Sequence, residues 1–364
     1  MEFDFCELSK PLRDAISLRG YQKPTPIQKE AIPLALQGFD IMGQAQTGTG
    51  KTAAFAIPII EMAKPEGKTL ALVMTPTREL SSQLKQEFSS LSRFKHLRVY
   101  SFYGGMPVQR DIKLLSSTVP DVAIGTPGRL KDLMQRGVLD VSAVKFLVLD
   151  EADMMLDLGF MEDVDWIISK TPKERQSFLF SATIPPKIQE ISSKHLKPDF
   201  KFVRIISKEL SPQIEERIIN LSSSEQKLAE LEKILREHQK ELIIVFVKTR
   251  KDAKELSALV KSMGFDAVSL HGDMTQKSRE HSLKLFKEGK ANIVIATDVA
   301  SRGLDIKGVG VVINFHIPED PEVYIHRIGR TGRIGKSGKA FSLVAPEEMK
   351  ALIRIKKLKQ KASV

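Results

Sequence analysis

The chain has 364 residues, of which 42% are hydrophobic and 28% charged, a balance typical of a folded protein with room for about two domains. Its single cysteine, Cys6, excludes an intrachain disulfide and any zinc site with several cysteine ligands. No apolar run approaches the ~18 residues of a membrane-spanning helix, and the first residues lack the apolar core of a secretory signal. The net charge of +11 favours a polyanionic partner, above all nucleic acid.

Short apolar runs alternate with amphipathic stretches along the first half of the chain. Runs that are apolar almost throughout are typical of strands in a parallel sheet that is covered on both faces. The alternation therefore predicts a doubly wound parallel α/β sheet. We expect helices over 79–91 and 161–169, and strands over 40–43, 69–74, 98–103, 121–125, 145–149 and 177–180.

The pattern weakens around residues 204–214, where Pro212 favours a break. It resumes with predicted strands over 242–247, 266–270, 292–296 and 309–315. We therefore expect two domains of the same architecture, 1–205 and 214–364, joined by a linker over 206–213. The basic segment 350–361 is predicted to be a helix, whose charged face is either solvated or in contact with phosphates.

Residues 45–52, AQTGTGKT, stand between an apolar strand and a helical run, as a phosphate-binding loop requires. Gly48 and Gly50 allow backbone N–H groups to turn toward an anion, and the start of the helix adds the positive end of its dipole. Lys51 can reach the β and γ phosphates of a nucleotide, and the Thr52 hydroxyl can ligate Mg²⁺.

A second chemical motif is the acidic pair Asp150 and Glu151, which ends the apolar run of 144–153, VKFLVLDEAD. Carboxylates at this end of a parallel strand lie where open α/β sheets bind their ligands. Asp150 suits Mg²⁺, and Glu151 suits orienting the water that attacks a γ phosphate. The alternative is that these acids only cap a helix; the phosphate loop about one hundred residues upstream makes the catalytic interpretation stronger.

Seven further motifs occur along the chain in a fixed order, and together they are highly specific for one class of protein. They are GYQKPTPIQ (20–28), PTREL (76–80), GG (104–105), TPGR (126–129), SAT (181–183), ATDVASRGLD (296–305) and HRIGRTGR (326–333). Together with DEAD at 150–153, this set resembles the DEAD-box family of ATP-dependent RNA helicases, in helicase superfamily two. The resemblance runs from about Phe3 to Val344 and implies a minimal core of two RecA-like domains with one ATP between them.

The resemblance also implies the roles of individual residues at the ATP site. Gln28 would hydrogen-bond the adenine edge, and Tyr21 would stack on the base. Lys51 and Glu151 would act in catalysis with Arg330 and Arg333, two arginine fingers that reach the γ phosphate. Thr52 and Asp150 would hold Mg²⁺. The implied nucleotide-binding residues are Tyr21, Lys23, Gln28, Gln46, Thr47, Gly48, Thr49, Gly50, Lys51, Thr52, Asp305, Arg330 and Arg333.

By the same resemblance, two further groups of residues would couple ATP to RNA and bind the RNA backbone. The coupling residues would be Asp153, Ser181, Thr183 and His326. Hydroxyls, glycine backbone and arginines contact phosphates without reading bases, so binding should be independent of sequence and sensitive to salt. The implied RNA-binding residues are Thr77, Arg78, Gly105, Thr126, Gly128, Arg129, Thr249, Thr297, Arg302 and Gly303.

The expected function is an RNA-dependent ATPase that unwinds short RNA duplexes or remodels RNA–protein complexes through ATP-driven domain closure. One alternative is an ATP-gated RNA clamp that serves as a platform for other proteins. Another is a DNA helicase of the same superfamily, which would differ in its response to the RNA 2′-hydroxyl. We expect ATP and Mg²⁺ as cofactors, RNA as partner, no membrane and no structural metal, and a cytoplasmic location.

Overall fold

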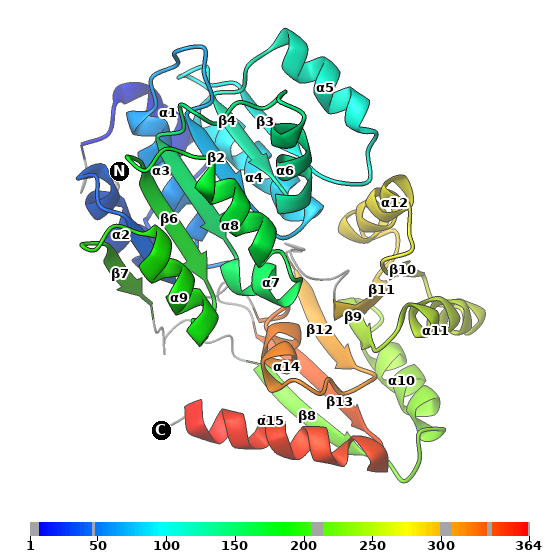
Figure 1. Ribbon diagram of the computed structural model, residues 1–364. Helices are drawn as coiled ribbons and strands as arrows, with labels where there is room; N and C mark the ends of the chain where they lie inside the picture. Colours follow the sequence, from blue (N-terminus) through cyan, green and yellow to red (C-terminus); the bar gives the residue numbers. More distant parts are fainter. Residues whose placement is uncertain (1–6, 46–47, 206–213, 299–307, 333–336, 363–364) are drawn as a thin grey trace. The chain divides into compact units, whose positions relative to one another are not determined.

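The computed structural model describes residues 7–45, 48–205, 214–298, 308–332 and 337–362, and it divides the chain into two compact units, Met1–Ile206 and Ser207–Val364. Each unit is a sheet of parallel strands with helices packed on its faces (Figure 1). The predicted linker over 206–213 lies outside the described residues.

The sheet of the first unit has seven strands, all parallel to their neighbours. Parallel neighbours need crossover connections, and helices supply them. In spatial order the strands are β3 (Val99–Phe102), β4 (Val122–Gly125), β2 (Ala71–Met74), β5 (Phe146–Asp150), β6 (Gln176–Ser181), β1 (Ile41–Gln44) and β7 (Lys201–Arg204).

Helices cover both faces of this sheet, because successive residues of a strand point to opposite sides. Val148 packs with one set of helices, while Leu147 and Leu149 pack with the other. The first face carries α1 (Lys10–Leu18), α2 (Pro26–Leu36), α3 (Lys51–Met62) and α4 (Arg78–Leu91). The second carries α5 (Val108–Ser117), α6 (Pro127–Gln135), α7 (Ala152–Asp157), α8 (Met161–Ser169) and α9 (Pro186–His195).

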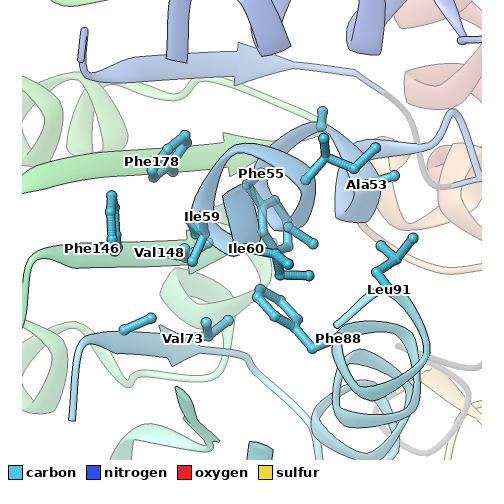
Figure 2. Close-up of a cluster of buried hydrophobic side chains, with 14 of the residues drawn as sticks. Ala53, Phe55, Ile59, Ile60, Val73, Phe88, Leu91, Phe146, Val148 and Phe178 are labelled. Carbon is cyan, nitrogen blue, oxygen red and sulfur yellow. The ribbon is translucent and has the colours of Figure 1, made fainter. Parts of the chain in front are cut away.

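Phe55 of α3 lies at the centre of the core on the first face. Figure 2 shows its ring between the sheet and Phe88 of α4. The centroid of the Phe55 ring lies 6.1 Å from that of Phe88 and 5.4 Å from that of Phe180 on β6. All three rings are fully buried, so this cluster fixes α3, which begins at Lys51, against the sheet.

The second unit has a six-stranded parallel sheet with helices on its faces. Its core clusters include α10 (Gln226–Glu237) and α11 (Arg250–Ser262), α12 (Gln276–Lys287), and α14 (Pro321–Ile328) with α15 (Met349–Ala362). A short 3₁₀ helix, Pro346–Glu348, precedes α15. In spatial order the strands are β10 (Ala267–Leu270), β11 (Ile293–Thr297), β9 (Leu242–Val247), β12 (Val309–Asn314), β13 (Gly338–Val344) and β8 (Ile214–Asn220).

The predicted doubly wound parallel fold is confirmed, and each predicted strand and helix lies within two residues of an observed one. The strand around 98–103 was expected to be buried on both faces, and this holds for Val99 and Phe102, which lie in the cores of opposite faces. Tyr100 and Ser101 are only half-buried because β3 lies at the edge of its sheet. The sequence analysis missed β7, β8 and β13; β7 and β8 are also edge strands and keep exposed polar residues. Among the described residues, no helix is both long and apolar enough to cross a bilayer.

The Phe55 cluster gives a test of the packing. Phe55→Ala should lower the free energy of unfolding by about 3–5 kcal/mol, because the change leaves a cavity that the rings of the cluster cannot fill. Phe94→Ala is the matched control, since that ring is 42% exposed, and it should cost less than about 0.5 kcal/mol. Urea unfolding followed by circular dichroism measures both values, and equal losses would contradict the assignment of this core.

Candidate functional site

In the first unit, the polar motifs follow the carboxyl ends of six of the seven strands. Because the strands are parallel, these ends share one edge of the sheet, where open α/β sheets bind ligands. The strand order divides them into two neighbouring groups. The phosphate loop, the acidic pair and the predicted coupling residues of this unit lie at the ends of β1, β5 and β6, whereas the predicted RNA contacts follow β2, β4 and β3. The predicted adenine residues, Tyr21, Lys23 and Gln28, precede β1 in the chain.

Gly50 ends the phosphate loop and begins α3 in a conformation that favours glycine. Its φ of +90° is left-handed, and a Cβ there would lie 2.4 Å from Gln28 Nε2 and 2.8 Å from Thr25 Oγ1. Gly48 is also left-handed, with a φ of +84°. As the N-cap of α3, Gly50 has no side chain that could accept from the first N–H groups of the helix, and an anion could do so instead.

Lys51 is the first residue of α3, and its ammonium group is buried at the sheet edge. Nζ lies 3.9 Å from Glu151 Oε1 and makes no hydrogen bond with any described residue. A buried cation without hydrogen bonds is costly. The arrangement therefore fits an anionic ligand whose oxygens would satisfy the ammonium group.

Asp150 and Glu151 stand where β5 passes into α7. Burial raises the pKa of Asp150 to about 7, and the Lys51 ammonium offsets this only in part. Glu151 has a left-handed backbone, with φ +54°, and its N–H donates to Asp150 Oδ1 over 3.0 Å. Residues without a glycine's freedom rarely adopt this conformation, and strain of this kind gathers at functional sites.

The residues of the predicted adenine motif are engaged within the first unit. Gln28 is buried; its Oε1 accepts from Thr25 N–H at 3.0 Å, and its Nε2 donates to the Gly50 carbonyl at 3.1 Å. Tyr21 is half-buried and its hydroxyl donates to Glu87 on α4. Lys23 is exposed. Gln28 therefore joins the start of α2 to the phosphate loop.

Asp153, near the start of α7, makes a dense set of hydrogen bonds with the residues that follow β6. Its Oδ2 accepts from the N–H and the hydroxyl of Thr183, at 2.8 and 3.0 Å, and from Ala182 N–H at 3.2 Å. Its own N–H donates to Ser181 Oγ at 3.1 Å. Three of the four predicted coupling residues are thus in direct contact; the fourth, His326, is a half-buried residue of α14 in the second unit.

The structure also brings together predicted RNA contacts of the first unit. Gly105 has a φ of +86°, and a Cβ there would lie 1.8 Å from Arg78 Nη1, so the two residues pack closely. Arg129 pairs with Asp111 and donates from Nη2 to the Met106 carbonyl at 2.6 Å.

The other predicted contacts of the first unit begin helices. Thr77 is the N-cap of α4 and accepts from Leu80 N–H at 3.3 Å. Thr126 is the N-cap residue of α6, whose first turn contains the exposed Gly128. These positions leave backbone N–H groups at two helix starts near the same edge.

In the second unit, Thr249 and Thr297 follow or end neighbouring strands, β9 and β11. Thr249 forms a capping box with Asp252 at the start of α11. Arg330 is buried just after α14.

Thr49 and Thr52, in the first unit, are half-buried at the start of α3. Six predicted site residues lie outside the described residues: Gln46, Thr47, Arg302, Gly303, Asp305 and Arg333.

The sequence analysis missed the acids that hold two arginines of the motifs. Asp111 pairs with Arg129 across 18 positions of the chain, a spacing that carries no local signal. Asp298 makes a two-pronged ion pair with Arg327, at 2.6 and 2.8 Å. The acid within the ATD of 296–298 offered a signal for this second pair, because it follows directly on an apolar strand.

Comparison with known proteins adds independent findings. The family model described as DEAD/DEAH box helicase matches residues 25–191, and the model described as helicase conserved C-terminal domain matches 226–335. The chain is 44% identical to ATP-dependent RNA helicase CshA of Limosilactobacillus reuteri, over 98% of this chain and 72% of that protein.

Two solved structures are similar along nearly the entire chain. Dbp5 of S. cerevisiae, bound to RNA and ADP BeF3, is 31% identical with a TM-score of 0.87, and the match covers 98% of this chain and 93% of that one. A DEAD box protein of the hyperthermophile Methanococcus jannaschii is 40% identical with a TM-score of 0.56, over 99% and 97% of the two chains.

The crowding at Gly50 can be separated from its backbone strain. Gly38 has nearly the same φ, +88°, but open space around it. Gly38→Ala should cost about 1–2 kcal/mol from the left-handed conformation alone. Gly50→Ala should cost roughly 1–3 kcal/mol more, because its methyl group meets Gln28. Thermal unfolding measures both, and a titration with fluorescent ADP should show weaker binding only for Gly50→Ala. Equal losses of stability would mean that the contact with Gln28 is unimportant.

Proposed function

Because this chain belongs to the DEAD-box family of ATP-dependent RNA helicases, we propose that it hydrolyses ATP when RNA is bound and so separates short RNA duplexes or remodels RNA–protein complexes. The observation that carries the proposal is the Lys51 ammonium, which is buried at the start of α3 and makes no hydrogen bond with any residue that the structure describes. A triphosphate is the ligand that would satisfy this cation, the open helix start and the glycine loop together.

Mg²⁺ would accompany the nucleotide, held by Thr52 and Asp150. Among the described residues no group of three His, Cys, Asp or Glu could hold a metal by itself. This fits Mg²⁺, which usually binds one or two carboxylates together with substrate phosphates and water. When bound, the ion would neutralise part of the negative charge of the phosphates. In its presence Asp150 would be ionised, whereas burial alone raises its pKa.

Glu151 is the proposed base that orients the attacking water. Its side chain is buried and lies within ion-pair distance of Lys51, so the base and the phosphate-binding cation belong to one site. Its left-handed backbone sets the direction in which the Glu151 side chain leaves the main chain. A preorganised group costs no reorganisation at the moment of reaction.

Arg330 and Arg333 are proposed to supply positive charge to the γ phosphate from the second unit. Planar guanidinium groups match phosphate oxygens in pairs, and such arginines contribute roughly 10³–10⁵ in rate in related phosphoryl transfer. Since Lys51 and Glu151 belong to the first unit, full activity would require the two units to close on ATP.

RNA is proposed to bind through its backbone. In the first unit the candidate residues combine arginines, a glycine turn and helix starts, which contact phosphates without distinguishing bases. In this proposal Asp153 and Thr183 couple the two ligands, because their strands β5 and β6 stand between the RNA group and the phosphate loop in the sheet order. Binding should weaken steeply with salt.

Lys51→Ala tests the proposed ATP site. The change should lower RNA-stimulated ATP hydrolysis by roughly 10²-fold or more, because it removes the cation from the transferred phosphate. Lys64→Ala is the matched control, since Lys64 is exposed just beyond the same helix, and it should keep full activity. Phosphate release in the presence and absence of RNA measures both. Undiminished hydrolysis in Lys51→Ala would refute the site.

Glu151→Gln separates chemistry from binding. The amide keeps the size of the side chain but cannot act as a base, so ATP and RNA should both bind and the complex should stall before hydrolysis. Labelled RNA should then dissociate much more slowly in ATP than it does from the wild type. Glu162→Gln, at an exposed position on α8, should behave as the wild type does. If RNA leaves the Glu151→Gln complex at the wild-type rate, the proposed role is wrong.

A strand-displacement assay with a short duplex distinguishes the proposed unwinding from the alternative of an ATP-gated clamp. Displacement that depends on ATP supports unwinding. Retention of RNA in ATP without displacement supports the clamp.

A further inference from the structure

The second unit contains a chain of buried polar side chains in an otherwise apolar core. Tyr324, Asn314 and Ser342 are fully buried, and Arg327 is 3% exposed. Burial of such groups is unfavourable unless each one is hydrogen-bonded. Here all four are hydrogen-bonded, and the bonds join them in series.

Arg327 of α14 is the first member of this polar chain. Its Nε and Nη2 donate to the two carboxylate oxygens of Asp298. Its Nη1 donates to Asn314 Oδ1 at 3.1 Å and to the His316 carbonyl at 2.6 Å. The guanidinium also lies 5.0 Å from the centroid of the Phe246 ring. All three nitrogens of the group are therefore used within the unit.

From Asn314 the polar chain continues to the outside of the unit. Asn314 Nδ2 donates to Ser342 Oγ at 3.2 Å, and that oxygen lies 2.9 Å from the Tyr324 hydroxyl. The Tyr324 hydroxyl donates to Glu216 Oε1 at 2.6 Å, which leaves the Ser342 hydroxyl as donor to Tyr324. The last member is Lys359 of α15, which pairs with Glu216 and lies 5.9 Å from the centroid of the Tyr324 ring.

The polar chain fixes α14 at two points of one face. Tyr324 and Arg327 are three positions apart, and residues at this spacing lie together on a helix. Through them α14 is bound to β12, β13, β8 and α15, which carry Asn314, Ser342, Glu216 and Lys359. The N–H of Arg330 donates to the Arg327 carbonyl at 3.1 Å, so the backbone that carries Arg330 starts from this fixed helix.

We propose that Tyr324 is a positioning residue for ATP hydrolysis, whose hydroxyl holds α14 so that Arg330 is presented in one orientation. Asn314 and Ser342 connect Tyr324 to Arg327. Through Lys359 and Glu216, α15 also holds the Tyr324 hydroxyl in place, and this contact is called the outer support. The inference rests on the proposed role of Arg330. Apolar side chains would fill the same core with at least equal stability; a fully satisfied polar network instead specifies a single geometry.

Tyr324→Phe in the full chain removes only the hydroxyl. ATP hydrolysis is measured with saturating RNA, at a temperature where circular dichroism shows that wild type and variant are both fully folded. We expect kcat to fall by about 3–30-fold because Arg330 is less well placed, with KM for ATP within about twofold of the wild type. Ser342→Ala is the second variant, in case Tyr324→Phe does not fold, and should show the same split.

Lys359→Met and Lys356→Met form a matched pair on α15. Lys359 contacts Glu216, whereas Lys356 is exposed. We expect a lower kcat for Lys359→Met and an unchanged kcat for Lys356→Met. Equal effects of the two changes would contradict the outer support.

A double variant tests whether Tyr324 acts through Arg330. If it does, Tyr324→Phe combined with Arg330→Ala should be no slower than Arg330→Ala alone, because the group being positioned is already gone. Full multiplication of the two losses would overturn the inference. So would a lower unfolding temperature with unchanged kcat, which would make the polar chain purely structural. Failure of the proposed function is recognised separately, by a wild type whose ATP hydrolysis does not respond to RNA.

Discussion

The common direction of the strands within each sheet is the constraint on which the arrangement of the candidate site depends. In the first unit it brings motifs that are distant in the sequence to one edge. The spatial order of the strands then matters more than their order along the chain. Strands β5 and β6 separate the phosphate loop from the strand ends that carry the candidate RNA contacts. The bond between Asp153 and Thr183 crosses between the loops that follow these two strands. The strand order therefore places the Asp153–Thr183 hydrogen bond between the phosphate loop and the candidate RNA contacts, which is where a link between the two proposed ligands would lie.

The site contains features that oppose stability, and the core supports them. Lys51 has a buried ammonium group that makes no hydrogen bond within the described part of the chain, Asp150 has a buried carboxyl with a raised pKa, and Glu151 has a left-handed backbone. Each of these features costs free energy. The rings of Phe55, Phe88 and Phe180 hold α3 against the sheet, so the start of this helix cannot relax to relieve the cost. A negatively charged ligand would offset part of this cost by hydrogen-bonding the Lys51 ammonium.

Much of the fold was predictable because the central strands are continuous in apolar residues and the helices between them are amphipathic. The sequence analysis failed at strands of the sheet edges. In β7 and β8, exposed polar residues interrupt the apolar run by which a buried strand is recognised. The phosphate loop and the acidic pair were identified from their sequence context, and the resemblance to the DEAD-box family implied the other candidate residues. The sequence could not predict Asp111 as the partner of Arg129, because these residues lie on two different helices, α5 and α6, whose contact depends on the fold. For the pair of Asp298 with Arg327, the acid directly after an apolar strand was the available signal. Nor could the sequence predict the positive φ of Glu151, because a glutamate, unlike a glycine, gives no signal for a left-handed backbone.

If Gln28 contacts adenine, as the resemblance to the DEAD-box family implies, its two hydrogen bonds would have a consequence for nucleotide selection. One side-chain amide closes the first turn of α2 and also holds the carbonyl of Gly50, at the point where the phosphate loop becomes α3. An adenine that competed for this amide would have to break one of these hydrogen bonds, and the break would alter the phosphate loop. A nucleotide with another base could still deliver its phosphates, but the loop would keep its resting shape. The protein would then distinguish among bases more by the rate of nucleotide hydrolysis than by the affinity for the nucleotide.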